Sequence, residues 1–114
     1  MEPGSKWSQL STSDRRKIGY SDDSFDDKWK RLPLDKPSWT VTSHLSKDGY
    51  MYIHPTQNRT ISVREAARLQ SFPDWFVFDG SRGAQFRQIG NAVPPLLAMN
   101  IAKHLKKIIS NQTR

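Results

Sequence analysis

The chain has 114 residues and a mass of 13.2 kDa, enough for one small domain. Hydrophobic residues make up 35% of it, which is low for a globular domain and argues against a large independent core. Eighteen Lys and Arg against eleven Asp and Glu give a net charge of +7, so the expected partner is a polyanion, nucleic acid before membrane.

Missing residue types exclude several kinds of chemistry. The chain has no cysteine, which excludes disulfides, thiolate metal sites and a cysteine nucleophile supplied by this chain. The three histidines, at positions 44, 54 and 104, lack metal-ligand spacing, so we expect no metal site. No apolar run is long enough for a membrane span, and the first residues do not resemble a signal peptide, so we expect a soluble intracellular protein.

Charge and order differ along the chain. Residues 1–53 carry nine bases and eight acids, whereas residues 54–114 carry nine bases and three acids. The positive field therefore belongs to the second half. Residues 1–32 are rich in Ser, Thr and Asp without periodicity, including an acidic run at 22–27, and we expect them to be poorly organised.

Two runs of β-forming residues, 39–43 and 50–53, predict a hairpin. Asp48 and Gly49 lie between them and are typical of a tight turn. The next element is a helix that begins at Ser62, because Ser62 and Glu65 have the spacing of a capping box. Phe72-Pro73 is expected to stop it.

Two further helices follow. Ser81 is expected to cap a short helical turn, after which Gly90 and Asn91 break the chain because both residues tolerate positive φ. The last helix begins at Pro94-Pro95, where a missing backbone donor costs nothing. Its apolar stripe has spacings of four, four and three residues and consists of Leu97, Ile101, Leu105 and Ile108.

The residue types alone suggest two candidate sites. A series of arginines suits phosphate contacts or, equally, a solvated face with ion pairs: Arg59, Arg64, Arg68, Arg82 and Arg87. The segment 88–95 joins an amide side chain to a helix N-terminus, which can bind a carboxylate or a ribose hydroxyl. The acidic side chains of this half, Glu65, Asp74 and Asp79, are interpreted as structural, and His54 as a hydrogen-bonded loop residue.

Two longer motifs carry a family resemblance. Residues 59–78, RTISVREAARLQSFPDWFVF, followed by residues 87–105, RQIGNAVPPLLAMNIAKHL, resemble the last two conserved blocks of DNA (cytosine-5) methyltransferases. Residues 36–55 look like the end of that family's target-recognition region. The resemblance divides the chain into a poorly organised segment (1–32), the end of the recognition region with its hairpin (33–58), and the C-terminal blocks with the closing helix (59–114).

The resemblance also implies a fold. The complete enzyme would be a doubly wound α/β domain with a smaller recognition domain. This chain would supply the end of the small domain and the closing helix that returns to the large one. As an isolated segment it is expected to be α+β.

The resemblance implies that a flipped cytosine is attacked by a cysteine thiolate and receives a methyl group from S-adenosylmethionine. In this family the nucleophile lies in a Pro-Cys block, its acidic helper in a Glu-Asn-Val block, and the cofactor loop in Phe-x-Gly-x-Gly; none of these occurs here. We therefore expect no catalytic residue in this chain. It would need a larger methyltransferase subunit, or the missing N-terminal part, to act on double-stranded DNA.

Site residues can be carried over at four positions. By similarity, Asn91 and Ala92 help to line the cofactor pocket, with Gly90 permitting the turn. Many relatives have Ser at position 92, so a contact there would come from the backbone. Thr40 corresponds to a residue that touches the DNA backbone.

The leading hypothesis is a C-terminal fragment or small subunit of a restriction-modification methyltransferase, cytoplasmic in a prokaryotic or viral context. One alternative is a free-standing basic DNA-binding module whose aromatic residues stack on bases: Trp39, Tyr50, Tyr52 and Trp75. The other is an inert gene remnant, whose exposed apolar stripe would favour self-association.

Overall fold

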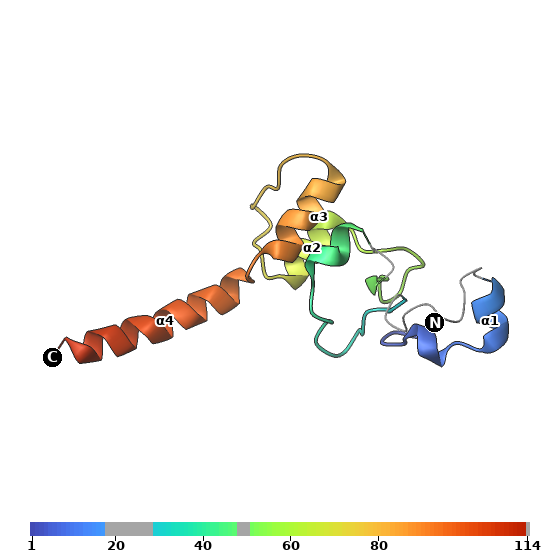
Figure 1. Ribbon diagram of the computed structural model, residues 1–114, viewed down its shortest axis with the longest axis horizontal. Coiled ribbons are helices and arrows are strands. Elements are labelled where there is room, and N and C mark those ends of the chain that lie inside the picture. Colours follow the sequence, from blue (N-terminus) through green and yellow to red (C-terminus); the bar gives the residue numbers. More distant parts are fainter. Residues whose placement is uncertain (18–28, 48–50, 114) are drawn as a thin grey trace.

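The computed structural model describes residues 1–17, 29–47 and 51–113, and Figure 1 shows a small body from which one long helix projects. Helices account for nearly all of the regular structure in these ranges. In chain order they are the 3₁₀-helix η1 (Trp7–Gln9), α1 (Thr12–Lys17), the 3₁₀-helix η2 (Ser43–Ser46), α2 (Val63–Leu69), α3 (Arg82–Asn91) and α4 (Pro95–Gln112).

The N-terminal segment is joined to residues 29–32 by backbone hydrogen bonds and by one buried aromatic residue. Trp7 is 2% exposed, and its ring lies 6.1 Å from that of Trp29. Next to it, Lys6 and Lys30 form an isolated antiparallel bridge. The acidic run at 22–27 lies outside the described residues.

The predicted hairpin is wrong. In the described ranges the backbone forms isolated bridges but no strand. Residues 43–46 turn into η2, and Tyr52 reaches the facing segment with its side chain instead of its backbone. Its hydroxyl donates to the Thr40 carbonyl at 2.8 Å and accepts from the Thr42 amide at 3.1 Å. The described chain is mostly helical, so an α+β class is not confirmed; the expected turn at 48–49 lies outside the described residues.

The capping box of α2 is confirmed. The Glu65 amide donates to Ser62 Oγ at 3.2 Å, and the Ser62 amide donates to Glu65 Oε2 at 2.7 Å. Ser81 caps α3 through a single hydrogen bond, which its Oγ accepts from the Ala84 amide at 3.3 Å. These local signals fix where both helices begin.

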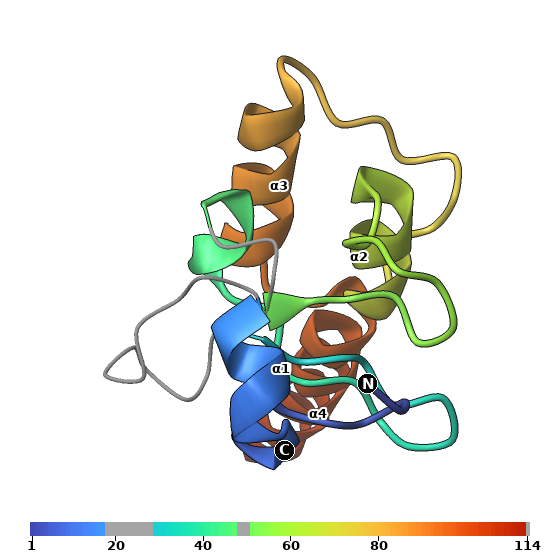
Figure 2. The same cartoon turned by 90° about the vertical axis from the view of Figure 1, so that its right-hand side faces the viewer.

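The core lies where α3 packs against η2 and α2, as Figure 2 shows. The deepest positions on the two α-helices are Ala66 and Ala67 of α2 and Ile89 of α3, each 0% exposed. The small alanines let the helices approach closely. The remaining buried members of this cluster are Leu32, Val41, Leu45, Tyr52, Ile61, Phe78 and Phe86.

Gly90 serves close packing and not a turn. It lies inside α3 without positive φ, and so does Asn91, so the predicted reason for a break at these residues is wrong. A Cβ at position 90 would lie 2.5 Å from the Thr42 carbonyl oxygen and 2.8 Å from Ser43 Cα. Only glycine allows α3 to meet the start of η2 this closely.

Helix α4 begins at Pro95 as predicted and runs away from the body (Figure 1). None of its residues is buried, and the predicted stripe residues Leu97, Ile101 and Leu105 are each about half exposed. The radius of gyration is 17.9 Å, against ~13 Å for a compact domain of this length. None of the helices in the described ranges has the length and apolar character that a membrane span requires.

Candidate functional site

The segment predicted to line a cofactor pocket is the end of α3 and the short link to α4. Gly90 and Asn91 form the last turn of α3, and Ala92 is its C-cap, with its amide donating to the Ile89 carbonyl at 3.3 Å. The Asn91 side chain is exposed, whereas Gly90 and Ala92 are half-buried. The three residues therefore present one polar amide and a small surface beside the start of α4.

Two residues at the end of α2 hold this link. The Gln70 side chain is buried, and its Nε2 donates to the Ile89 carbonyl at 3.1 Å and to the Ala92 carbonyl at 3.3 Å. The Ser71 hydroxyl accepts from the Leu96 amide, in the first turn of α4, at 3.2 Å. Both ends of the link are thus fixed from α2.

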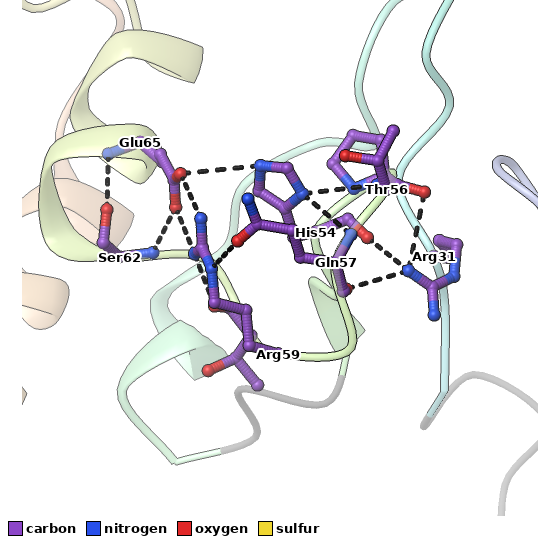
Figure 3. A network of polar contacts seen from close by, with 9 residues as sticks. Arg31, His54, Thr56, Gln57, Arg59, Ser62 and Glu65 are labelled. Carbon is purple, nitrogen blue, oxygen red and sulfur yellow. Dashed lines mark hydrogen bonds and ion pairs between the residues drawn. The ribbon is translucent and has the colours of Figure 1, made fainter.

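The second part of the site is the loop 54–58, which precedes α2 (Figure 3). The guanidinium of Arg31, a buried residue, donates to the carbonyls of His54 at 2.7 Å and Gln57 at 2.9 Å, and to Asn58 Oδ1 at 2.7 Å. From within the loop, His54 Nδ1 accepts the amides of Thr56 and Gln57. The interpretation of His54 as a hydrogen-bonded loop residue is confirmed.

Glu65 ties this loop to α2. Arg59 donates to both of its carboxylate oxygens, at 2.8 and 2.7 Å, and His54 Nε2 lies 3.6 Å from Oε1. The hydrogen bonds from Arg59, and after them those from Ser62, lower the pKa of Glu65 from 4.5 to about 2. Glu65 is a structural anion in these contacts, as predicted.

The arginine series is largely engaged with the protein itself. Besides Arg59, Arg68 forms a bidentate pair with Asp74 at 2.9 Å, which lowers the pKa of that carboxyl. Arg64 donates twice to the Phe76 carbonyl. These contacts support the ion-pair reading of the series over phosphate binding. Arg82 and Arg87 are exposed on α3.

Few of the expected DNA-facing side chains are free to stack. Tyr52 is 1% exposed and Trp39 is partly buried against the core, whereas Trp75 is 78% exposed. Tyr50 lies outside the described residues. Thr40 is exposed, at the start of the segment that leads to η2.

Sequence reasoning missed the roles of Arg31, Gln70 and Ser71. Each acts on backbone groups 19 or more residues away, and no spacing pattern reveals such contacts. For Gln70 and Ser71 the sequence signal is a side-chain amide and a hydroxyl directly after a helix, where glycine is common.

Comparison with known proteins decides the family. The profile of the family described as C-5 cytosine-specific DNA methylase matches residues 2–107. The chain belongs to this family. M.OihORF3336P of Oceanobacillus iheyensis is 62% identical over 90 residues, which cover 79% of this chain and 20% of that protein. The type II methyltransferase M.AgeI of Thalassovita gelatinovora is 54% identical over 86 residues, 75% of this chain and 20% of the relative.

A third relative, the type II methyltransferase M.Bpa9945I of Bacillus paralicheniformis, is 46% identical over 99 residues, covering 85% of this chain and 22% of the relative. The chain thus spans about one fifth of the length of these relatives. No solved structure matches it. This C-5 methylase segment contains no cysteine.

Proposed function

We propose that this chain is the C-terminal part, or small subunit, of a DNA cytosine-5 methyltransferase and is inactive without a larger chain. The observation that carries the proposal is α4, an amphipathic helix without a buried residue, in a chain that spans one fifth of its relatives. The larger part would supply the cysteine nucleophile and the cofactor loop, and would bury the apolar stripe of α4.

The exposed area supports a missing partner. The chain exposes 8238 Å², about 1,800 Å² more than the ~6,400 Å² of a compact monomer of this mass. A standard interface buries roughly 800 Å² on each partner. The excess is therefore larger than one side of a standard interface.

The cofactor would be S-adenosylmethionine, which supplies the methyl group when bound. What supports this assignment is that Asn91 offers an exposed amide and Ala92 has only a small side chain beside it. Gly90, Asn91 and Ala92 would form one wall of the pocket, and the larger part would form the rest. Thr40 would contact the DNA backbone.

Trans-complementation tests the proposal. A version of M.AgeI that lacks the stretch matching this chain is expressed alone, with this chain, or fused to it, and transfer of tritiated methyl groups to double-stranded DNA is measured. We expect no transfer by either part alone and transfer by the pair or the fusion. Activity of the fusion but not the pair would identify a fragment, whereas inactivity of both, with the parts folded, would refute the proposal.

A free-standing DNA-binding module is less well supported. Two arginines of the series are neutralised by carboxylates, and two of the aromatic residues are withdrawn from the surface. A DNA-binding module would use the basic residues that remain exposed, but this role does not explain why the apolar face of α4 is left unburied.

A further inference from the structure

The link between α3 and α4 is short and only partly buried, yet it must place the proposed cofactor residues. It consists of Ala92, Val93 and Pro94, and Val93 is 61% exposed. Since no residue of α4 is buried, the direction of this helix relative to α3 depends on what holds the link. Gln70 and Ser71, which belong to neither α3 nor α4, hold the link.

Gln70 holds the α3 end of the link. The Ile89 carbonyl, in the last turn of α3, accepts the Ala92 amide at 3.3 Å, and its second lone pair can accept a further donor. The two hydrogens of the Gln70 amide meet two acceptors here, the carbonyls of Ile89 and Ala92, at 3.1 and 3.3 Å. Gln70 is 6% exposed and Ile89 0%, so this contact lies inside the core and fixes where the link begins.

Ser71 holds the α4 end, in a conformation that costs it energy. The Ser71 and Phe72 amides donate to the Arg68 and Ala67 carbonyls, which is the Schellman pattern that ends α2. The residue at this place has φ of 61° and is usually glycine. A serine adds nothing to the termination of α2, so its hydroxyl requires another explanation.

That explanation is the cap of α4. Pro94, the N-cap, has no side-chain acceptor, and Pro95 has no amide hydrogen. Leu96 therefore carries the first backbone donor of the helix, and Ser71 Oγ accepts it at 3.2 Å. A residue just beyond the C-cap of α2 thus performs the capping that the proline sequence cannot.

We infer that Gln70 and Ser71 are positioning residues that set the geometry of the segment Gly90–Ala92 against the cofactor by clamping both ends of the α3–α4 link. The inference rests on the proposed function for its chemical consequence. A shift of the link by about 1 Å would move a cofactor wall out of productive geometry.

The first test uses the 114-residue chain alone. Ser71→Gly removes the hydroxyl and relieves the positive φ, so the core should unfold at the same or a higher temperature. Exchange of the Leu96 amide with water, followed by NMR, should become about fivefold faster, the effect of losing one N-cap. A role of Ser71 only in ending α2 predicts unchanged exchange, and that result would overturn the clamp. Ser81→Ala, which removes the cap of α3, should leave Leu96 unaffected.

The second test uses the fusion with the larger part of M.AgeI. Gln70→Met removes the two donors while keeping the size of the side chain. We expect KM for S-adenosylmethionine to rise about fivefold or more, with KM for DNA unchanged. Gln85→Met is the matched control, because the Gln85 amide donates to the Gly80 carbonyl at the other end of α3.

The two tests separate the possible failures. If the unsubstituted fusion transfers no methyl group, the proposed function fails, while amide exchange still decides whether the clamp exists. If Leu96 exchange responds but KM for S-adenosylmethionine does not, the link is clamped without positioning the cofactor, and the inference is overturned. A rise in KM for DNA alone would overturn it as well.

Discussion

Gly90→Ala tests the closest contact of the core. A Cβ at this position would meet three backbone atoms, the Thr42 carbonyl oxygen at 2.5 Å, Ser43 Cα at 2.8 Å and the Thr42 carbonyl carbon at 2.9 Å. Because none of them belongs to a flexible side chain, α3 must move away from η2 by several tenths of an ångström. Packing at Ile89, which is fully buried, would loosen with it.

The cost can be estimated from two opposing effects. Overpacking of a core costs typically ~1–3 kcal/mol, and the upper end applies here because backbone must yield. Alanine in a helix regains up to ~1 kcal/mol relative to glycine. The net loss is about 2 kcal/mol, which lowers the melting temperature by roughly 10 °C for a chain of this size. Thermal unfolding followed by circular dichroism measures it.

Gly83→Ala is the matched control in the same helix. A Cβ at Gly83 meets nothing within 4 Å, so only helix propensity acts, and this variant should melt at the same temperature or slightly higher. If Gly90→Ala melts within 2–3 °C of the control, less than ~1 kcal/mol separates them, and the close approach at Thr42 does not restrict position 90.

Three further perturbations follow from the contacts. The pKa of Glu65 is about 2 in the fold against an ordinary 4.5, so the stabilisation from its ionised form is complete above pH 4.5 and disappears as pH falls towards 2. Because the Glu65 side chain is 30% exposed, we expect this stabilisation to be ~1–2 kcal/mol. In acid unfolding, Glu65→Gln should lack this loss of unfolding free energy between pH 4.5 and 2. Arg31→Met leaves the His54 and Gln57 carbonyls without their donor. It should lower the free energy of unfolding, measured by urea denaturation, by about 2–3 kcal/mol. Leu105→Asp on the apolar stripe should weaken binding to the larger chain at least ~100-fold, whereas Lys103→Asp, on the opposite face by helical spacing, should not. Equal losses would contradict docking through the stripe.

Helix starts could be predicted from the sequence because their signals are local. The capping box at Ser62 and Glu65, the cap at Ser81 and the proline at position 95 all act within one helical turn, and each begins a helix in the structure. Such contacts need no distant partner. The spacing of these residues along the chain is therefore enough to predict where each helix begins.

The hairpin could not be predicted correctly because the fold uses those residues in another way. Val41 and Tyr52 carry high β-propensity, but this propensity largely reflects how well a side chain packs in its surroundings. Here Val41 enters the core from the segment before η2, and Leu45 from η2 itself. The Tyr52 hydroxyl bonds to the backbone that a partner strand would otherwise pair with.

The candidate site divides in the same way. The segment Gly90–Ala92 was located from its motif, yet its real constraints come from Gln70 and Thr42. In the first constraint, the Gln70 side chain bonds to a backbone carbonyl. In the second, the Thr42 backbone lies so close to Gly90 that it leaves no room for a Cβ there. Neither leaves a complementary residue type that could be recognised in the sequence.

The short helix α2 connects the two parts of the site, and this explains the composition of its motif. Ala66 and Ala67 are fully buried, which holds α2 rigidly between the loop 54–58 and α3. At the start of α2, Glu65 organises that loop through Arg59, and at its end Gln70 reaches the carbonyls of the α3–α4 link. The seven-residue helix thus has a polar anchor at each end. The polar residues of the motif therefore act at both ends of α2, and the loop 54–58 and the α3–α4 link share one support.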